Sequence, residues 1–414
     1  MPVSVDTILL LALGAPLVPL VDPGVGALLI LVLGSYAVLD AVARSSARLG
    51  SARTVFNLKL MLALLAIFLA VVLPTVSGMI MRRGAEPWQY THDGAIQIEE
   101  SIKYLLQGKN PYTEDYLGTP LAQWEYAFQG DEGNPALYHN VYLPFISLFS
   151  IPFYLVIKHM TGWYDQRLIY LFLFVCTLWP LMKHAAAPFR KLSLLIVFGL
   201  NFFTAFYSVW GVNDSFVMFW LIMSTYLLKK DRITLSALSL GLACASKQTA
   251  WVFVPFFLTY VWFRAPSPDR WAYLRKAYPL LVVPLLFIVP FLLWDAAAFV
   301  GDTYSYWAGR AASSYPISGV GFGGLLVALG LIRDENRYFP FALCQIAFCV
   351  PLLIYLLRRQ LSSNTIEQSW LGYGLLLLAV LFFSRYFNES HLGIIVGALA
   401  LAYFSEPGPR EGRR

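Results

Sequence analysis

Residues 56–80 read FNLKLMLALLAIFLAVVLPTVSGMI, and Lys59 is the one charged side chain among them. An α-helix rises about 1.5 Å per residue, so a run of this length crosses the roughly 30 Å hydrocarbon core of a bilayer. Comparable apolar runs recur along the chain and predict about twelve transmembrane helices. They lie near residues 7–21, 24–42, 56–80, 141–157, 167–183, 191–209, 215–229, 233–264, 277–299, 338–357, 368–384 and 390–405. The sequence therefore predicts an all-α polytopic membrane protein.

The composition excludes a soluble protein. Of the 414 residues, 58% are hydrophobic and 13% are charged, whereas soluble domains carry about 25% charged residues. The net charge of +6 does not indicate a nucleic-acid partner, because no long basic run is interleaved with aromatic residues. The four cysteines lie in apolar stretches without metal-ligand spacing, so neither a disulfide framework nor a metal site is predicted.

The long polar segment, residues 82–140, carries nine acidic and four basic side chains. The short connection at 43–55 instead holds three arginines and no acid. Since short basic connections stay on the cytoplasmic side, we expect the long loop on the outer face. By helix count the connections at 300–337 and 385–391 share that face, while Arg358, Arg359 and the arginine-rich C-terminal tail lie inside.

One connection, residues 183–191, conflicts with this count. Its charge, from Lys183, Arg190 and Lys191, places it inside, whereas helix parity places it outside if 233–264 crosses once. The same parity places the basic residues at 229–232 outside. A re-entrant or split helix within 141–264 would remove the conflict. The apolar piece 320–332 is too short to span and is expected along the interface.

The outer loop contains a predicted amphipathic helix near 93–107. Its apolar residues share one face at helical spacing and would rest on the bilayer surface, with Glu99 and Glu100 on the solvent side. Asp93 stands at the N-cap position, and Gly108 followed by Asn110-Pro111 ends the helix. A capping role explains Asp93, but a carboxylate at the membrane face also suits a general base for an acceptor hydroxyl.

Polar residues also interrupt the apolar runs. Asn213-Asp214 precedes an apolar helix, where either a capping or a substrate-binding role fits. Lys247 lies in the tetrapeptide 246–249, which divides the run 233–264 into a broken helix or two short ones. An ammonium between apolar half-helices needs a counter-charge. A polyprenyl phosphate would provide one, and snorkelling of the lysine to the interface is the alternative.

Further candidates for substrate binding lie on the predicted outer face. His139 precedes the run at 141, and Arg310 ends an aromatic segment at 302–310; an interfacial polar cluster or aromatic belt is the alternative for each. Between the last two runs, Arg385, Glu389 and His391 are packed more densely than a turn requires. The glycines at 319–324 follow no predicted strand, so a nucleotide-binding loop is rejected there.

In their order and placement these motifs resemble those of GT-C fold glycosyltransferases, and among them the polyprenyl-phosphate-mannose-dependent mannosyltransferases. The resemblance rests on His92-Asp93-Gly94 with the following amphipathic helix and GKNPY at 108–112, on YLP at 142–144, on GVND at 211–214 and on the segment 240–249. It covers most of residues 56–310, which we take as the catalytic module with its outer loop 82–140. Two additional transmembrane helices at 1–55 precede the module, and the helices at 311–414 follow it.

The resemblance implies an inverting transfer of a mannose-like sugar from a polyprenyl-phosphate donor to a lipid or glycan acceptor at the outer face. Asp93 would be the general base, and Lys247, Arg310, Arg385 and His391 would neutralise the departing phosphate. No cofactor is required, and a divalent metal is compatible with the pattern without being implied by it. We expect an integral protein of the plasma or inner membrane, surrounded by membrane lipids, with its active site on the extracytoplasmic face.

The alternative is a polytopic transporter or lipid flippase with a substrate site near Asn213, Asp214 and Lys247. A transporter concentrates its ionisable groups within the spans and often contains paired repeats. Here these groups gather in the outer loop, and no internal duplication is visible. A polysaccharide ligase or polymerase that uses the same class of donor is a third interpretation.

Overall fold

A computed structural model describes residues 3–45, 51–124 and 134–406, which are predominantly helical. Two short strands, β1 (Ser318–Gly319) and β2 (Tyr386–Phe387), pair in parallel. The helices in the described ranges are α1 (Val5–Gly14), α2 (Pro23–Ser45), α3 (Ala52–Ile67), α4 (Leu73–Arg83), α5 (Asp93–Leu106), α6 (Phe145–Thr161), α7 (Arg167–Met182), α8 (Pro188–Leu200), α9 (Phe202–Trp210), α10 (Asp214–Lys229), α11 (Ile233–Ser246), α12 (Val254–Arg264), α13 (Arg270–Lys276), α14 (Pro279–Trp294), α15 (Ala296–Val300), α16 (Tyr306–Ala308), α17 (Phe322–Ala328), α18 (Phe341–Ser362), α19 (Ile366–Phe382) and α20 (Ser390–Phe404).

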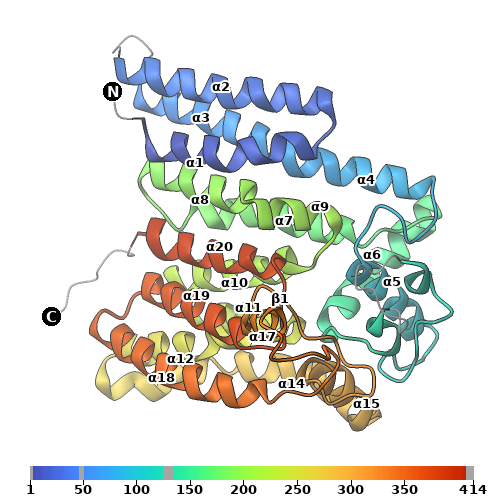
Figure 1. The fold of residues 1–414 in the computed structure, drawn as a ribbon. Helices are drawn as coiled ribbons and strands as arrows, with labels where there is room; N and C mark the ends of the chain where they lie inside the picture. The colour runs from blue at the N-terminus through green and yellow to red at the C-terminus, as the bar shows by residue number, and fades with distance from the viewer. Residues whose placement is uncertain (1–2, 46–50, 125–133, 407–414) are drawn as a thin grey trace.

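The long helices lie side by side in one bundle (Figure 1). The connection that carries α5 and α6 and the connection between α14 and α18 gather at one end of the bundle, which we call the loop end. Both chain termini lie at the opposite end, the terminal end. Large apolar side chains such as Leu31, Leu286 and Leu343 are exposed along the flanks, as expected for a surface that contacts lipid.

Several helices are long and apolar enough to cross a membrane. Among the described residues there are four such helices, Pro23–Ser45, Ala52–Arg83, Ser267–Trp294 and Phe341–Ser362. The pair formed by α8 and α9, bent by 46°, adds a fifth if it counts as one span. This confirms the predicted class of an all-helical membrane protein.

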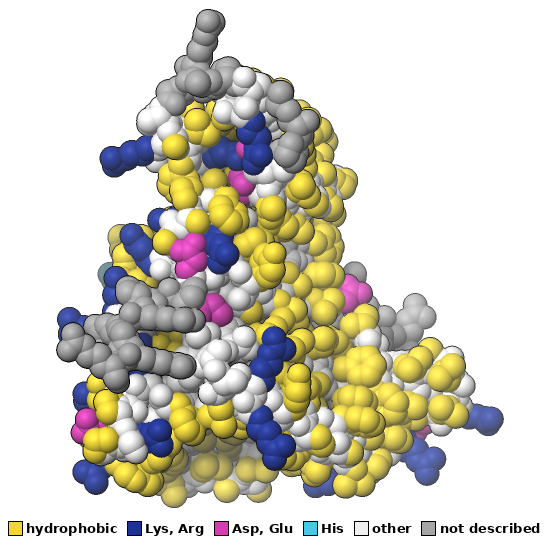
Figure 2. Space-filling view, turned by 90° about the vertical axis from the view of Figure 1, so that its left-hand side faces the viewer, with side chains coloured by type: hydrophobic (Ala, Val, Ile, Leu, Met, Phe, Trp, Pro, Cys, Tyr) yellow, Lys and Arg dark blue, Asp and Glu magenta, His cyan; other side chains and the backbone are white. Residues whose placement is uncertain are grey.

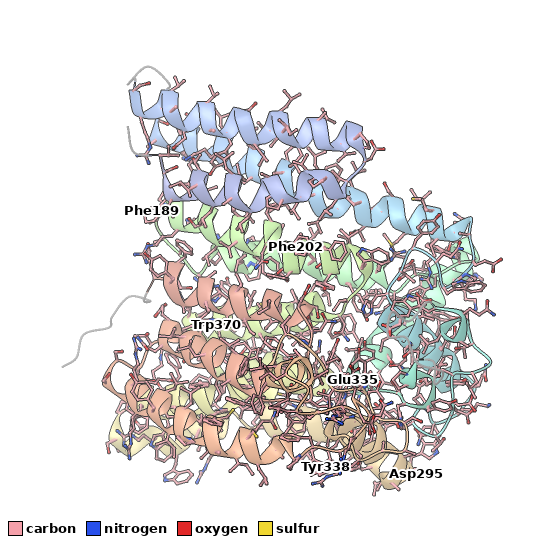
Figure 3. All side chains as sticks on the ribbon, in the orientation of Figure 1. Phe189, Phe202, Asp295, Glu335, Tyr338 and Trp370 are labelled. Atoms are coloured by element: carbon pink, nitrogen blue, oxygen red, sulfur yellow. The ribbon has the colours of Figure 1, made fainter. Side chains whose placement is uncertain are left out.

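Two of these helices change geometry at identifiable residues. Between α3 and α4 a π-helical turn, Phe68–Val72, precedes Pro74, and the wider turn lets the helix continue past a residue that has no N–H. Between α8 and α9 the backbone of Asn201 leaves the helical region, and its side chain accepts a hydrogen bond from the N–H of Phe203. Figure 3 places Phe189 at the terminal end and Phe202 midway along the bundle, so the bend at Asn201 lies inside the crossing.

The first helices are joined to the bundle by a buried ion cluster. The Lys59 ammonium on α3 lies 2.6 Å from a carboxylate oxygen of Asp6 on α1 and 2.7 Å from one of Asp40 on α2. The Tyr36 hydroxyl also donates to Asp6. Lys59, the one charge in the run 56–80, therefore fixes α1 and α2 against α3.

The interrupted run 233–264 forms two short helices rather than one. α11 ends at Ser246, Lys247 is extended, and a 3-10 turn, Gln248–Phe253, leads into α12. Arg264 at the end of α12 pairs with Asp231 just before α11, at 3.3 Å. The two helices are therefore antiparallel, and Lys247 lies at the turn of a hairpin directed towards the loop end.

The apolar run 141–157 was expected to cross the membrane, but the helix that it forms, α6, does not run along the bundle. α6 packs on α5, and Phe145 at its start contacts Phe216 in the first turn of α10. The carbonyl of Thr161 at its other end accepts a hydrogen bond from Arg83, the last residue of α4. Both ends of α6 thus lie at the loop end, where Figure 1 shows it beside α5. The first turns of α6, including Phe145 and Ile146, are buried in a cluster with residues of α5 and α10, whereas Leu155, Val156 and Met160 further along are exposed.

The position of α6 resolves the conflict at 183–191. If α6 is not counted as a span, helix parity places the α7–α8 connection at the terminal end. The contacts agree, because Glu406 beyond α20 accepts hydrogen bonds from the backbone N–H groups of Ala186 and Ala187 in that connection. The basic residues at 229–232 fall at the same end, because Lys229 donates to the carbonyl of Glu406. Figure 2 shows this end with lysines and arginines spread over it. The arginine-rich tail, at 407–414, lies outside the described residues.

Candidate functional site

Two adjoining cavities open at the loop end. The larger, of about 320 Å³, is lined by Lys247, Arg310, Arg385 and His391 among mainly apolar side chains, and we call it the basic cavity. The smaller, of about 220 Å³, contains Asp93, and we call it the carboxylate cavity. The shared wall consists of Val141, Tyr142, Trp307 and Tyr386. The charges are segregated: the residues lining the basic cavity include no Asp or Glu, and those lining the carboxylate cavity include no Lys or Arg.

Asp93 is the first residue of α5, and His92 is the N-cap, one residue earlier than the sequence suggested. One oxygen of Asp93, Oδ1, accepts a hydrogen bond from the N–H of Gly94 at 2.6 Å and lies 2.6 Å from Nδ1 of His92. The other oxygen, Oδ2, has one long contact, with Asn134 at 3.4 Å. Burial opposes ionisation, but the His92 imidazole and these hydrogen bonds outweigh it and lower the pKa of Asp93. The carboxylate is therefore ionised at neutral pH, with one oxygen available in the cavity.

His92 holds Asp93 in position. The backbone N–H of His92 donates to the carbonyl of Trp210 at the end of α9, at 2.8 Å. This bond ties the start of α5 to the bundle. Nδ1 of His92 lies 2.6 Å from Oδ1 of Asp93 and 3.1 Å from the backbone nitrogen of Gly94, so the three residues share one set of contacts. Burial lowers the pKa of His92, but the charge of Asp93 outweighs this effect, and the pKa is raised.

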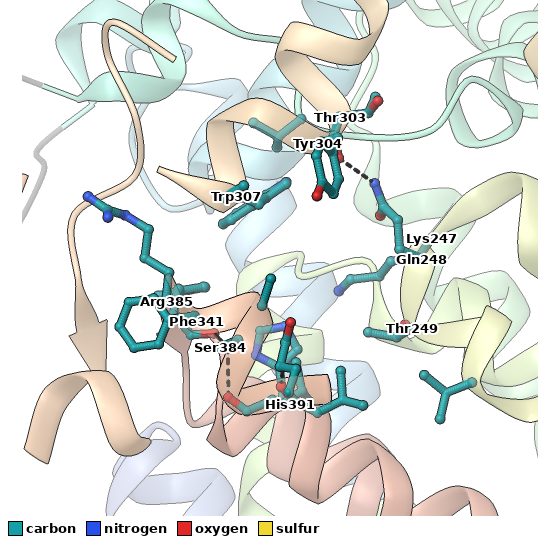
Figure 4. Close-up of a pocket in the computed structure, with 18 of the residues that line it drawn as sticks. Lys247, Gln248, Thr249, Thr303, Tyr304, Trp307, Phe341, Ser384, Arg385 and His391 are labelled. Carbon is teal, nitrogen blue, oxygen red and sulfur yellow. Dashed lines mark hydrogen bonds between the residues drawn. The ribbon is translucent and has the colours of Figure 1, made fainter. Parts of the chain in front are cut away.

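Lys247 lies with Asn213 and Asp214, as the sequence interpretation grouped them. Its ammonium forms an ion pair with Asp214 and donates to the side-chain oxygen of Asn213 at 3.1 Å. The neighbouring Gln248 donates to the carbonyl of Thr303, which ties the hairpin turn to the segment after α15 (Figure 4). Oδ2 of Asp214 is buried without a hydrogen-bond partner. Lys247 therefore enters the basic cavity already paired, and a phosphate there would share its charge with Asp214.

Two other side chains line the basic cavity. His391, in the first turn of α20, donates through Nδ1–H to the carbonyl of Asn388 and packs against Tyr386 and Phe387. Arg310 is exposed, and its guanidinium donates to the hydroxyl of Tyr338 at 3.2 Å. Figure 3 places Tyr338 in the connection between α14 and α18 at the loop end. An exposed guanidinium at the rim is free to turn towards an anion that enters.

Arg385 lines the same cavity, but its guanidinium is committed elsewhere. It donates to the carbonyl of Tyr315 and to those of Arg337 and Glu335, at 2.8 and 2.9 Å. Figure 4 shows it pointing away from Lys247 and His391. Burial lowers the pKa of Arg385. These contacts indicate that Arg385 holds the segment 315–337 against β2. They leave its guanidinium less available for direct contact with a phosphate.

His139 and Glu389 are not among the residues that line either cavity. His139 pairs through Nδ1 with Asp302, at 2.6 Å, and Asp302 also accepts from the N–H of Asn140. This contact joins the end of the outer loop to the segment between α14 and α18. Glu389 is exposed before α20. The structure thus brings Asp93 and the Lys247 group to the cavities and leaves these two residues at the periphery.

The expectation that Glu99 and Glu100 face solvent is wrong, since each is 7% exposed. Glu99 accepts two hydrogen bonds from the Arg82 guanidinium, at 2.8 and 2.7 Å, and Arg82 also pairs with Asp165 at 3.0 Å. Arg167 completes the cluster by pairing with Asp165. The polar face of α5 is therefore buried against the ends of α4 and α7, a contact that helical periodicity does not reveal.

The walls of the carboxylate cavity include residues that the sequence did not single out. Gln97, Asn388 and six Trp and Tyr side chains line it together with Asp93. These aromatic residues come from separate segments of the chain and are Trp124, Tyr142, Tyr306, Trp307, Tyr315 and Tyr386. Flat apolar faces with polar groups between them suit a sugar ring. The density of aromatic residues at 302–310 was the available signal, and it was equally typical of an interfacial belt.

No group of three or more His, Cys, Asp or Glu side chains is arranged to hold a metal ion within the described ranges. The four cysteines are free, with Cys244 and Cys349 buried. Asp93 in the carboxylate cavity and the cationic side chains of the basic cavity lie on either side of a shared wall.

No protein-family model matches the chain, and no curated protein matches it.

Proposed function

We propose that this protein is a membrane glycosyltransferase with a GT-C-like arrangement. It transfers a sugar from a polyprenyl-phosphate donor to a hydroxyl group of a lipid or glycan acceptor. The observation that carries the proposal is the segregation of charge between two adjoining cavities, with cations in one and an ionised carboxylate in the other.

The basic cavity suits the donor. Besides its cations it is lined by apolar residues of α18 and α19, among them Phe341, Ala342, Leu377 and Leu381. Cationic groups attract the phosphate, and the apolar wall between two membrane helices accepts the first isoprene units. Its volume of about 320 Å³ lies at the lower end of the usual range for small-molecule sites, roughly 300–1,000 Å³.

In the reaction that we propose, the acceptor lies in the carboxylate cavity. Asp93 takes the proton of the acceptor hydroxyl while the hydroxyl oxygen forms a bond to C1 of the donor sugar. The bond from C1 to the phosphate oxygen breaks, and its electron pair leaves with polyprenyl phosphate. Lys247 and Arg310 stabilise the charge on that leaving group. Attack from the side opposite the phosphate inverts the configuration at C1, which suits reactants that approach from opposite cavities.

The proposal includes a membrane orientation. We infer twelve crossings, made by α1, α2, α3–α4, α7, α8–α9, α10, α11, α12, α14, α18, α19 and α20, with α5 and α6 on the outer surface. This arrangement places the basic connections at the terminal end in the cytoplasm, in agreement with the positive-inside rule. The two cavities then lie on the extracytoplasmic side, in the plasma or inner membrane.

The direct test uses purified full-length protein in lipid nanodiscs. It is incubated with a panel of polyprenyl-phosphate sugars, polyprenyl-phosphate mannose first, and with an extract of membrane lipids and glycans as acceptors. We expect release of polyprenyl phosphate together with transfer of labelled sugar into the acceptor fraction. Absence of both with every donor would contradict the proposal.

The transporter or flippase stays the second candidate. Asn213, Asp214 and Lys247 do form one cluster, as a transport site there requires. The separate cavity beside Asp214 has a volume of only about 10 Å³, however, which leaves no room for a substrate. Movement of a fluorescent polyprenyl-phosphate sugar between the leaflets of proteoliposomes, without release of polyprenyl phosphate, would favour this function.

A further inference from the structure

Tyr142 occupies the boundary between the two cavities. It lies three residues before Phe145, the first residue of α6, and lines both cavities. Its backbone is fixed, because the Tyr112 hydroxyl donates to its carbonyl at 2.7 Å. The preceding residues, Asn140 and Val141, donate their N–H groups to Asp302 and Gln97. A side chain on so restrained a backbone has a defined position at the wall.

The hydroxyl of Tyr142 differs from those of nearby tyrosines. The hydroxyls of Tyr112, Tyr116 and Tyr164 all donate to protein oxygens. The Tyr142 hydroxyl forms no hydrogen bond within the part of the chain that the structure describes, and Tyr142 lines both cavities. A polar group at a cavity wall without a protein partner is available to a ligand, and a phenol is both a donor and an acceptor.

The position of this hydroxyl depends on Gly94. A Cβ atom at Gly94 would lie 2.1 Å from the Tyr142 hydroxyl oxygen and 3.1 Å from the ring carbon that carries it. The Gly94 N–H is meanwhile one of the donors to Asp93. Gly94 is therefore needed because it has no side chain and the phenol can approach its backbone closely, not because its backbone adopts an unusual conformation. It lets the phenol rest against the first turn of α5, beside the carboxylate.

The electrostatic surroundings keep this phenol protonated. Burial, and then the negative charge of Asp93, raise the pKa of Tyr142 well above its usual range. At neutral pH Tyr142 thus presents an O–H group. It is a donor for an oxygen that gains negative charge.

We propose that Tyr142 is a further catalytic residue of the transferase, and that it donates a hydrogen bond to the donor's glycosidic oxygen as that oxygen leaves with the phosphate. Since C1 must lie where the two cavities meet, the wall that carries Tyr142 faces the bond that breaks. The proton stays on the phenol, and the electron pair leaves with polyprenyl phosphate as described above. This inference rests on the proposed function and adds a neutral donor to the cations of the basic cavity.

The first experiment replaces Tyr142 with phenylalanine, which removes the hydroxyl and keeps the ring. A hydrogen bond that strengthens in the transition state lowers kcat when it is lost, with KM nearly unchanged. We expect kcat for release of polyprenyl phosphate to fall about tenfold to a hundredfold, within or below the range for single oxyanion donors. Tyr104→Phe is the matched control, because that hydroxyl donates to the Asp115 carbonyl within the loop. It should leave kcat unchanged.

The second experiment tests the contact with Gly94 by a double-mutant cycle. Gly94→Ala in the wild-type background must displace the phenol, so we expect a loss of kcat comparable to that of Tyr142→Phe. In the Tyr142→Phe background the clashing oxygen is absent, and Gly94→Ala should cost little more. Thermal unfolding of each variant in detergent shows whether it folds.

The outcomes separate this inference from the function on which it rests. A wild-type protein that releases no polyprenyl phosphate contradicts the proposed function itself. An active wild type with full kcat in Tyr142→Phe contradicts the role of the hydroxyl alone. Equal losses from Gly94→Ala in both backgrounds also contradict it, because the glycine would then act through something other than Tyr142.

Discussion

At the scale of single residues, Asp93 owes its ionisation to its immediate chain neighbours. His92 and Gly94 supply a short imidazole contact and a backbone hydrogen bond to the same oxygen. Burial by itself would raise the pKa of this carboxyl, and these neighbours reverse the shift. The tripeptide at 92–94 therefore contains both a candidate base and the groups that keep it charged. This ionisation is the property that the proposed role of Asp93 as a general base requires.

The first prediction concerns Asp93 itself. Asp93→Asn keeps the size of the side chain and removes its capacity to accept a proton, so we expect transfer to fall at least a hundredfold, within the usual range for general bases. Release of polyprenyl phosphate measures this. Asp115→Asn, in the same loop, is the control and should retain full activity. A folded Asp93→Asn variant with wild-type turnover would remove Asp93 from the mechanism.

The second prediction concerns pH. Asp93 accepts a proton only when ionised, so activity is lost as the pH falls through its pKa, and a lowered pKa keeps the protein active into mildly acidic solution. His92→Gln removes the imidazole contact, and burial then raises the pKa of Asp93. The acid limb of kcat/KM against pH should then move to higher pH.

The control for this shift is His159→Gln, since His159 is exposed near the end of α6. Its pH profile should match that of the wild type. An unchanged acid limb in His92→Gln would show that His92 does not set the ionisation of Asp93.

At the scale of elements, α5 is fixed to the bundle by charge as well as by apolar contact. Ala95, Ile98 and Ile102 pack against residues of α6, α7 and α10, while Glu99 on another face pairs with Arg82 at the end of α4. The helix is thus clamped between the bundle and its own loop. An amphipathic helix that merely rested on lipid would have left its acidic face in water.

The third prediction follows from this clamp. Glu99→Ala leaves Arg82 buried with one fewer partner, and breaking a buried pair costs about 3–5 kcal/mol. We expect a clear drop in the thermal unfolding temperature in detergent, with loss of activity. Glu114→Ala breaks the partly exposed pair with Lys109 and should cost at most about 1 kcal/mol. Similar stabilities for the two variants would contradict a structural role for the clamp.

At the scale of the whole molecule, the position of one helix decides the orientation of those that follow. α6 is about as apolar as the helices that we propose as spans, yet both of its ends lie at the loop end. Taken as a surface helix, it brings Lys183, Lys230 and Arg232 to the end that carries the other short basic connections. The charge distribution and the helix packing then give one orientation, which neither gave alone.

The fourth prediction tests that orientation by cysteine labelling. The four native cysteines are first replaced, and single cysteines are introduced at the exposed positions Leu117, Thr161 and Lys230. A membrane-impermeant maleimide added to intact cells should label Leu117→Cys and Thr161→Cys and leave Lys230→Cys unlabelled until the membrane is opened. Labelling of Thr161→Cys from the opposite side to Leu117→Cys would mean that α6 crosses the membrane.

Much of the architecture could be predicted from local pattern. Apolar runs identify lipid-contacting helices because hydropathy is a property of a single segment, and the class of helical membrane protein follows from it. The break at Lys247 was also visible, because a charge in an apolar run has few structural explanations. The roles of Asp93 and of the other candidate residues stay predictions, which the experiments above address.

The sequence by itself determined that this chain is a helical membrane protein with one acidic loop and a few charges among apolar helices. The tertiary structure decided which of those charges meet. It buried Glu99, occupied Arg385 with backbone carbonyls, and placed Tyr142 between Asp93 and Lys247. Periodicity fixes the face of a helix on which a residue lies, whereas a cavity requires segments far apart in the chain to pack together, and that depends on the whole set of contacts.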